Sequence, residues 1–185
     1  MEYINYLKSN NFFYPIIIIL LSLISSSFFA FIIDNPIIYD AVEYDRIAVN
    51  INKGYFSRDA YEPYSATMNR APLYPLFLSI IYKTFGHNYN IVFFFQILLF
   101  SLTCLFTYLI SKELFGEKIA SLSGILIAIY PTLASYPGYI LSETLFSFLL
   151  IVSIFLLTKS FKLKKISIFF YSGIFLGLVS ITKVI

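Results

Sequence analysis

DNPIIYDAVEYDRIAVNINKGYFSRDAYEPYSATMNRAPLYP, residues 34–75, is the longest polar interval in this chain of 185 residues. It holds six of the ten acidic residues and four of the thirteen basic ones: Asp34, Asp40, Glu43, Asp45, Asp59, Glu62, Arg46, Lys53, Arg58 and Arg70. Most of the remaining sequence is apolar, so charge is concentrated in one place and excluded elsewhere. We interpret that place as the outer face of a membrane.

The overall composition is that of an integral membrane protein. The chain is 59% hydrophobic and 12% charged, with a mean hydropathy of +0.81, whereas soluble domains carry about 25% charged residues. The net charge of +3 is small and no block of like charges occurs, so we expect no nucleic-acid partner. Cys104 is the only cysteine, which excludes an internal disulfide and a thiol-based metal site.

Apolar runs of the length of a membrane span predict an all-α, polytopic protein with about five transmembrane helices, because a span needs roughly 17 to 25 residues. The predicted spans are residues 12–33, 91–111, 119–137, 141–158 and 166–183. The first run has 22 residues without a charge, longer than the roughly 7 to 15 of a signal-peptide core. We therefore interpret it as a retained anchor.

The short apolar run 71–85, interrupted by Pro72 and Pro75, decides the orientation. If it does not cross, seven of the thirteen basic residues lie on the cytoplasmic side: Lys8, Lys112, Lys118, Lys159, Lys162, Lys164 and Lys165. If it crosses, only three do: Lys8, Lys83 and Lys183. Because Lys and Arg in short loops are retained in the cytoplasm, the first arrangement is favoured. We predict a cytoplasmic N-terminus, a plasma-membrane location, an outer loop 34–90 and an interfacial helix at 71–85.

Within the outer loop, residues 40–53 have the pattern of an amphipathic helix. Tyr44, Ile47, Ala48 and Ile51 recur at helical spacing, and Gly54 is a natural stop. Asp40 with Glu43 three residues later has the spacing of a capping box, which places Asp40 at the N-cap.

Two residues of this loop have both a structural and a chemical interpretation. Asp40 is either only a helix cap or a general base at the outer leaflet, with Glu43 and Tyr44 on the same side of the helix. Arg70 is either an exposed charge that pairs with an acid or headgroup, or a ligand for a phosphate beside the N-terminus of the next helix. At a membrane surface that phosphate would belong to a lipid.

Two charged residues lie at the ends of predicted spans. Glu143 follows the Tyr136-Pro137-Gly138-Tyr139 break, and it is either a carboxylate that reaches the interface or a functional acid. Lys183 ends the last span and faces outward in this topology. His87, in the turn GHNYN, is more typical of a solvated loop residue than of a ligand. No His/Cys metal spacing, Gly-rich phosphate loop or G-x-S-x-G motif occurs, so no metal site is predicted.

Together these motifs resemble C-type glycosyltransferases, the polytopic enzymes of the protein-mannosyltransferase and aminoarabinose-transferase superfamily. The resemblance rests on five segments in order: D-A-V-E-Y-x-x-I-A-x-N-I-x-x-G (40–54), R-A-P-L-Y-P-L-F-L (70–78) with F-G (85–86), Y-P-x-L-x-x-Y (130–136), S-E-T-L-F (142–146) and G-L-V-S-I-T-K (177–183). Each motif alone is weak, but all five in register are moderately specific.

The resemblance implies an enzyme of the cell envelope that moves a hexosyl or pentosyl group from a polyprenyl-phosphate carrier to a lipid or protein acceptor on the non-cytoplasmic face. It implies that Asp40 is the catalytic base, that Arg70 holds the carrier phosphate, and that Glu143 completes a pocket with Glu43, Tyr44 and Lys183. Some relatives have paired acids where this chain has Asp40-Ala41. This difference weakens the argument for a divalent metal cofactor without excluding one. Full members have many more spans, so residues 1–185 correspond to the N-terminal portion of such a membrane domain.

The competing hypothesis is a small transporter or an accessory membrane subunit without catalysis. A transporter is expected to have broken or polar helices near the bilayer midplane. Here the predicted breaks lie near the outer ends of the spans and the charge lies in one outer loop. This pattern favours chemistry on a lipid substrate at the membrane surface. The sugar, the acceptor and the length of the lipid are left open.

Overall fold

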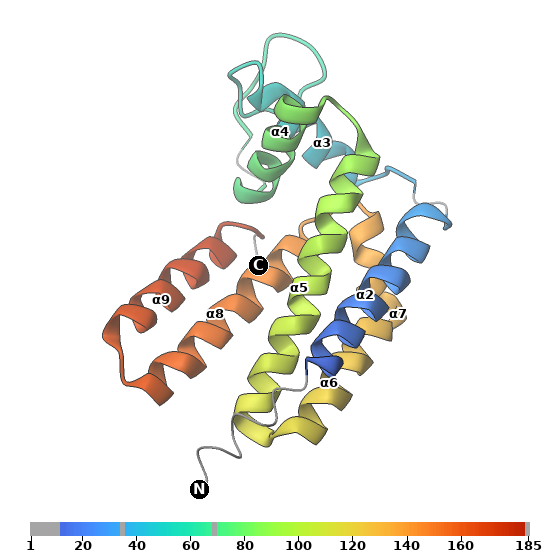
Figure 1. The fold of residues 1–185 in the computed structure, drawn as a ribbon. Helices are drawn as coiled ribbons and strands as arrows, with labels where there is room; N and C mark the ends of the chain where they lie inside the picture. The colour runs from blue at the N-terminus through green and yellow to red at the C-terminus, as the bar shows by residue number, and fades with distance from the viewer. Residues whose placement is uncertain (1–11, 34–35, 68–69, 184–185) are drawn as a thin grey trace, which may run out of the picture.

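The computed structural model describes residues 12–33, 36–67 and 70–183, and its regular secondary structure is helical, with no strand in these ranges (Figure 1). The prediction of an all-α polytopic fold is confirmed. Lys8 and Asp34, which entered the charge counts above, lie outside these residues. The elements are α2 (Phe13–Phe31), α3 (Asp40–Ile51), α4 (Leu73–Phe85), α5 (Tyr89–Phe115), α6 (Glu117–Ile129), α7 (Pro131–Ser135), η1 (Tyr136–Gly138), α8 (Glu143–Leu163) and α9 (Ile166–Ser180).

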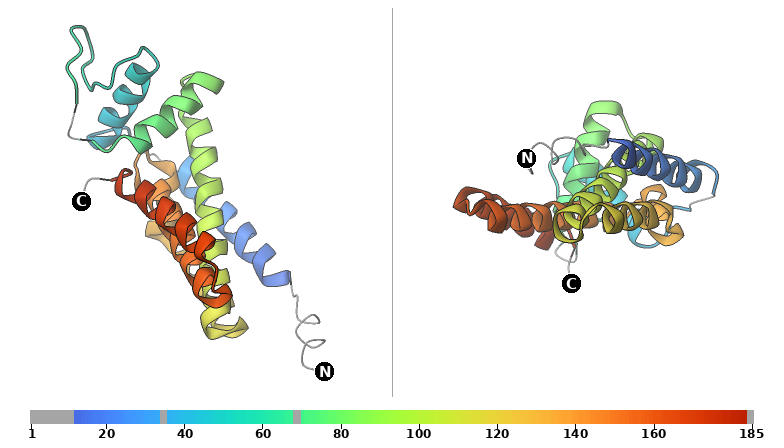
Figure 2. Two further views of the ribbon diagram at one scale, coloured as in Figure 1. Left: turned by 90° about the vertical axis from the view of Figure 1, so that its left-hand side faces the viewer. Right: turned by 60° about the horizontal axis from the view of Figure 1, so that its bottom comes forward.

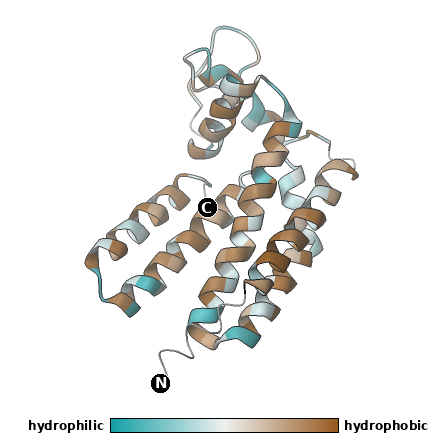
Figure 3. Cartoon of the chain, in the orientation of Figure 1, coloured by the Kyte–Doolittle hydropathy of each residue, from teal (hydrophilic) through white to brown (hydrophobic). Residues whose placement is uncertain are grey.

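Three helices in the described residues, α2, α5 and α8, are each long and apolar enough to cross a membrane. They have 19, 27 and 21 residues, which at 1.5 Å per residue gives about 28 to 40 Å, against about 30 Å of hydrocarbon. Brown, the colour of hydrophobic residues, predominates along these helices in Figure 3, and teal is concentrated at their ends and in the region of α3.

The third predicted span, residues 119–137, is interrupted by a sharp bend. Helix α6 ends at Ile129, and α7 with η1 continues from Pro131 after a bend of 54°. Proline lacks an N–H and its ring clashes with the carbonyl four residues earlier, so Pro131 starts a new helix and cannot continue the old one. The bent pair together is long and apolar enough for one span.

The fifth predicted span, residues 166–183, is shorter in the structure. Helix α9 has only 15 residues and ends at Ser180, about 22 Å of helix. It packs antiparallel against α8 (Figure 1). Residues 181–183 leave the helix in a turn, and this turn carries Lys183 toward α4.

Helices α3 and α4 lie together at one end of the bundle in two perpendicular views (Figures 1 and 2). Helix α4 has 13 residues and ends at Gly86, whose φ of +80° is readily adopted by glycine. The α5–α6 and α8–α9 turns lie at the opposite end (Figure 1). This is the relative arrangement that the charge distribution predicts, while the side that faces the cytoplasm stays a prediction.

The start of α3 differs from the predicted capping box. The N-cap is Tyr39, with φ +50° and no side-chain cap, so Asp40 is already the first residue of the helix. The N–H groups of Ala41 and Val42 bond to the carbonyls of Ile38 and Tyr39, each at 3.1 Å. The prediction that Asp40 is the N-cap is therefore wrong. The carboxylates of Asp40 and Glu43 instead accept hydrogen bonds from the guanidinium of Arg70. A hydrogen bond between two charged groups is stronger than one from a backbone N–H.

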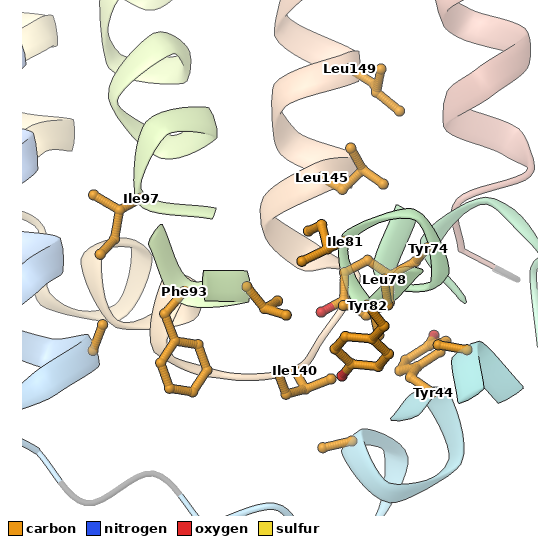
Figure 4. Packing of buried hydrophobic residues seen from close by; sticks show 14 of the residues in the cluster. Tyr44, Tyr74, Leu78, Ile81, Tyr82, Phe93, Ile97, Ile140, Leu145 and Leu149 are labelled. Atoms are coloured by element: carbon orange, nitrogen blue, oxygen red, sulfur yellow. The ribbon is translucent and has the colours of Figure 1, made fainter. Parts of the chain in front are cut away.

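A tyrosine-rich core joins the α3–α4 pair to the bundle. Tyr44 packs edge-on against Tyr74, with ring centroids 5.0 Å apart, and both rings are buried with Leu78, Ile140 and Leu145 (Figure 4). Aromatic pairs in this geometry contribute about 0.5–1.5 kcal/mol beyond the area they bury. The N-terminal turn of α3 is thus fixed relative to the N-terminal end of α8.

A second core joins α2, α5 and α6 through small residues. A Cβ on Gly124 would lie 2.5 Å from Cδ1 of Ile18, so a larger residue there would force the Ile18 side chain to shift. Ala120 and Ala128 of the same helix are buried, and the Ser25 hydroxyl donates to the carbonyl of Ala128 at 2.5 Å. Close packing of small residues with interhelical hydrogen bonds is typical of helices in lipid.

Candidate functional site

A polar pocket of about 180 Å³ lies where the α3–α4 pair meets the bundle. Three separate parts of the chain enclose it: the first turn of α3, the segment before α4, and the start of α8 together with the turn that follows α9. Its lining residues are Asp40, Tyr44, Arg70, Ala71, Leu141, Ser142, Glu143 and Lys183.

Arg70 bridges the two carboxylates of the first turns of α3. Its Nη2 donates to Oδ1 of Asp40 at 2.6 Å, and its Nε donates to Oε2 of Glu43 at 2.7 Å. The guanidinium also lies over the ring of Tyr44, 5.3 Å from the centroid. The hydrogen bond to Asp40, followed by that to Glu43, raises the pKa of Arg70 above its ordinary value. The group is therefore charged at every physiological pH.

A second ion pair closes the other side of the pocket. Nζ of Lys183 donates to Oε1 of Glu143 at 2.9 Å. The other carboxylate oxygen of Glu143, Oε2, is buried and has no hydrogen-bond partner among the described residues. A buried, unpaired carboxylate oxygen is costly. Oε1 of Glu143 thus accepts from Lys183, and Oε2 is available to accept from another donor.

The pocket walls are held together by Gln96 of α5, which is fully buried. Its Nε2 donates to the carbonyls of Pro137 and Tyr139 at 3.0 and 2.8 Å, and its Oε1 accepts from the Tyr74 hydroxyl at 3.0 Å. One amide thus links α4 to the segment that leads into Glu143. Because every member of this network is satisfied, it fixes these segments in one arrangement.

The C-terminal side is fixed by a backbone hydrogen bond. The N–H of Leu73, the first residue of α4, donates to the carbonyl of Ile181 at 3.0 Å. This bond joins the start of α4 to the turn after α9. It places Arg70 and Lys183, 113 positions apart in the sequence, on the same pocket.

An apolar cavity of about 200 Å³ adjoins the polar pocket within the bundle. It is enclosed by α5, α6, α7 and α8, and Glu143 lines both spaces. The lining residues are Phe100, Thr103, Thr107, Ile127, Leu133, Tyr136, Glu143, Thr144, Ser147, Leu150, Ile151 and Ile154. A charged compartment next to an apolar one fits an amphiphile whose headgroup and hydrocarbon part enter different spaces.

The structure brings together all six residues predicted from the sequence. Five of them line the pocket, and the sixth, Glu43, contacts it through Arg70. Sequence reasoning missed Gln96 and Ser142, although both carry a signal. Gln96 is a polar residue within the predicted span 91–111, and Ser142 directly precedes Glu143. The Ser142 hydroxyl is 3.4 Å from that of Tyr44.

His87, expected to be solvated, has a partner. Its Nε2 lies 2.8 Å from Oδ1 of Asp45, which also accepts from the Tyr82 hydroxyl at 2.8 Å. The histidine side chain is about half exposed and lies outside the polar pocket. Burial, followed by the charge of Asp45, raises the pKa of Tyr82 far above its ordinary value, so this phenol stays protonated. No group of three or more His, Cys, Asp or Glu residues that could hold a metal occurs in the described ranges.

The family model described as dolichyl-phosphate-mannose-protein mannosyltransferase matches residues 69–185, which include Arg70, Glu143 and Lys183. Asp40, Glu43 and Tyr44 precede the matched region. No curated protein and no solved structure matches the chain.

Proposed function

Because the chain belongs to the dolichyl-phosphate-mannose-protein mannosyltransferase family of membrane glycosyltransferases, we propose that it transfers a sugar from a polyprenyl-phosphate carrier to an acceptor hydroxyl on the non-cytoplasmic face. The observation that carries the proposal is the shared wall at Glu143 between a charged pocket and an apolar cavity. The phosphate and sugar occupy the charged pocket, and the first prenyl units occupy the apolar cavity.

Asp40 acts as the general base. Arg70 holds its Oδ1 at 2.6 Å, which leaves Oδ2 to accept the proton of the acceptor hydroxyl. The acceptor oxygen attacks the anomeric carbon, the bond from that carbon to the phosphate oxygen breaks, and the carrier leaves with the electron pair as polyprenyl phosphate. The donor is already activated, so the protein supplies a base, positioning and charge stabilisation.

Arg70 and Lys183 stabilise the departing phosphate. The cluster of Asp40, Glu43, Glu143, Arg70 and Lys183 has three carboxylates and two cations, so it carries one net negative charge. The carrier phosphate must therefore compete with a carboxylate for Arg70. When the phosphate takes a share of the guanidinium, Asp40 is held less tightly and becomes a stronger base. Glu143 orients Lys183 and, through its free Oε2, accepts a hydroxyl of the sugar.

The experiment that tests the site is binding of farnesyl phosphate, a short polyprenyl phosphate, to the purified chain in detergent. Arg70→Ala should weaken binding roughly 10- to 100-fold, because a hydrogen bond to a charged group contributes about 1.5–3 kcal/mol. Arg70→Lys should recover only part of this loss, because a point charge replaces a planar fork.

Arg46→Ala is the matched control, since Arg46 is exposed on the same helix pair and does not line the pocket. It should leave the affinity unchanged, and farnesol, which lacks the phosphate, should bind much more weakly than farnesyl phosphate. Equal affinities of wild type and Arg70→Ala would remove Arg70 from the phosphate site. Equal affinities for farnesol and farnesyl phosphate would show that the phosphate is not recognised.

A further inference from the structure

The turn between α8 and α9 has a concentration of positive charge at the end of the bundle opposite the polar pocket. The sequence KSFKLKK, residues 159–165, has four lysines in seven positions. Teal marks this turn as hydrophilic between two largely brown helices (Figure 3). None of these lysines lines the polar pocket or the apolar cavity described above.

Glu113 of α5 pairs with two of these four lysines and offsets one of their four positive charges. It pairs with Nζ of Lys159 at 2.7 Å and with Nζ of Lys162, and its own side chain is only 14% exposed. These two lysines therefore have a structural role in joining the ends of α5 and α8. Lys164 and Lys165 are both exposed, and neither side chain has an ion pair with any residue in the described ranges.

The two remaining lysines line a groove of about 230 Å³ together with apolar side chains. The other lining residues are Ser160, Phe161, Ile166 and Phe169. Lys164 ends α8 in the left-handed conformation and Lys165 is the N-cap of α9, so the chain reverses within two residues. The reversal places two ammonium groups beside Phe161 and Ile166, which are 71% and 82% exposed.

We propose that this groove binds an anionic phospholipid, with its phosphate between Lys164 and Lys165 and the start of an acyl chain against Phe161 and Phe169. The two uncompensated amines exceed the single charge of one phosphodiester, so a lipid with a neutral net charge is a poorer partner than an anionic one. Basic residues that flank a membrane helix attract anionic lipid in this way. The exposed apolar side chains distinguish a lipid from free phosphate, which would leave them uncovered.

This site is independent of sugar transfer, because it lies at the other end of the bundle and shares no residue with the polar pocket. Lys118 provides a matched control. It is an exposed lysine near the α5–α6 turn, at the same end of the molecule, and it lines neither this groove nor the polar pocket.

The test is titration of the purified chain in neutral detergent with phosphatidylglycerol or phosphatidylcholine of the same acyl chains, with bound lipids counted by native mass spectrometry. Phosphatidylglycerol should bind at least about tenfold tighter than phosphatidylcholine. Lys164→Gln and Lys165→Gln should each weaken phosphatidylglycerol binding about fivefold, and the double variant about 25-fold, which follows from the attraction of one lysine to an anionic lipid surface. Lys118→Gln should stay within about twofold of wild type.

Three results would overturn the proposal. The first is equal affinity of wild type for the two lipids. The second is a loss of phosphatidylglycerol affinity in Lys118→Gln as large as the loss in the double variant at Lys164 and Lys165. That result would indicate only diffuse attraction of anionic lipid to this whole end of the bundle. The third concerns free phosphate: sodium phosphate should displace no more lipid than sodium chloride at the same ionic strength, and complete displacement by phosphate alone would show a site for the free ion.

Discussion

At the scale of single residues, Arg70 organises the polar pocket because its guanidinium donates hydrogen bonds to two carboxylates at once. The bonds to Asp40 and Glu43 use different nitrogen atoms and are short, at 2.6 and 2.7 Å. Glu43 has a second, longer contact of 3.5 Å with the more exposed Arg58. Exposed ion pairs contribute little to stability, whereas part-buried, charge-assisted bonds contribute more. The two arginines therefore differ in what they contribute although both contact Glu43.

A pair of double-mutant cycles tests this difference. The cycle of Arg70→Ala with Glu43→Gln should give a coupling free energy of about 1 kcal/mol, because the bond is short and the guanidinium is mostly covered. The cycle of Arg58→Ala with Glu43→Gln should give a value near zero, within about 0.3 kcal/mol. Unfolding in detergent, followed by circular dichroism, measures both. Equal coupling in the two cycles would mean that Arg70 is an ordinary surface charge.

At the scale of elements, helix existence could be predicted well and helix ends less well. The pattern of Tyr44, Ile47 and Ala48 predicts α3, and all three side chains are buried. The cap could not be predicted, because Asp40 fits an N-cap as well as an ion pair, and only the position of Arg70 in space decides between them. Pro131 is a local signal for the break in the third predicted span, but the length of the apolar run 119–137 obscured it.

The length of α9 and the role of Gln96 depend on contacts between distant segments. Helix α9 ends at Ser180, and the carbonyl of the next residue, Ile181, accepts a hydrogen bond from the start of α4, a contact that no local pattern encodes. Gln96 fits an apolar helix only because Tyr74 and two carbonyls of the 137–139 segment surround it. The six candidate site residues could be named from motifs, but their assembly into one pocket required the fold.

The Gln96 network predicts a large loss of stability when the amide is removed. Gln96→Leu leaves the Tyr74 hydroxyl and the carbonyls of Pro137 and Tyr139 buried without that partner. Because each such group costs about 1–3 kcal/mol, the free energy of unfolding should fall by more than about 3 kcal/mol. Thermal unfolding in detergent measures this loss.

Thr103→Val on the same helix is the control, since the Thr103 hydroxyl bonds only to the Leu99 carbonyl one turn earlier. It should change the free energy of unfolding by less than about 0.5 kcal/mol. A Gln96→Leu protein as stable as Thr103→Val would show that the α4 and 137–139 segments are held by other contacts.

At the scale of the whole molecule, the charged pocket and the lysine-rich turn lie at opposite ends of the bundle (Figure 1). The positive-inside rule predicts this separation of the lysine-rich turn from the charged pocket if the α5–α6 and α8–α9 turns are cytoplasmic. The polar pocket then faces the other side, which is the side on which the proposed function places the lipid-linked sugar and its acceptor.

Cysteine labelling in intact cells tests this orientation. Ala66→Cys in the α3–α4 loop should react with a membrane-impermeant maleimide added outside, and Lys118→Cys should react only after permeabilisation. Both positions are exposed, whereas the native Cys104 is buried in α5 and should stay unlabelled. Labelling of both introduced cysteines from the same side would contradict the arrangement of the bundle across the membrane.

The most direct measurement follows label from a panel of polyprenyl-phosphate sugars, mannose and other hexoses and pentoses, in membranes that contain the chain or its Asp40→Asn variant. Asparagine keeps the shape of the side chain and one acceptor for Arg70, but it cannot accept the proton of the acceptor hydroxyl. Wild type should convert one of the labelled donors to a glycosylated acceptor and free polyprenyl phosphate. Asp40→Asn should insert to the same level and transfer about 100- to 10,000-fold more slowly, the usual contribution of a general base. Equal rates of transfer in the two membranes, or no transfer above membranes without the chain, would contradict the proposed function.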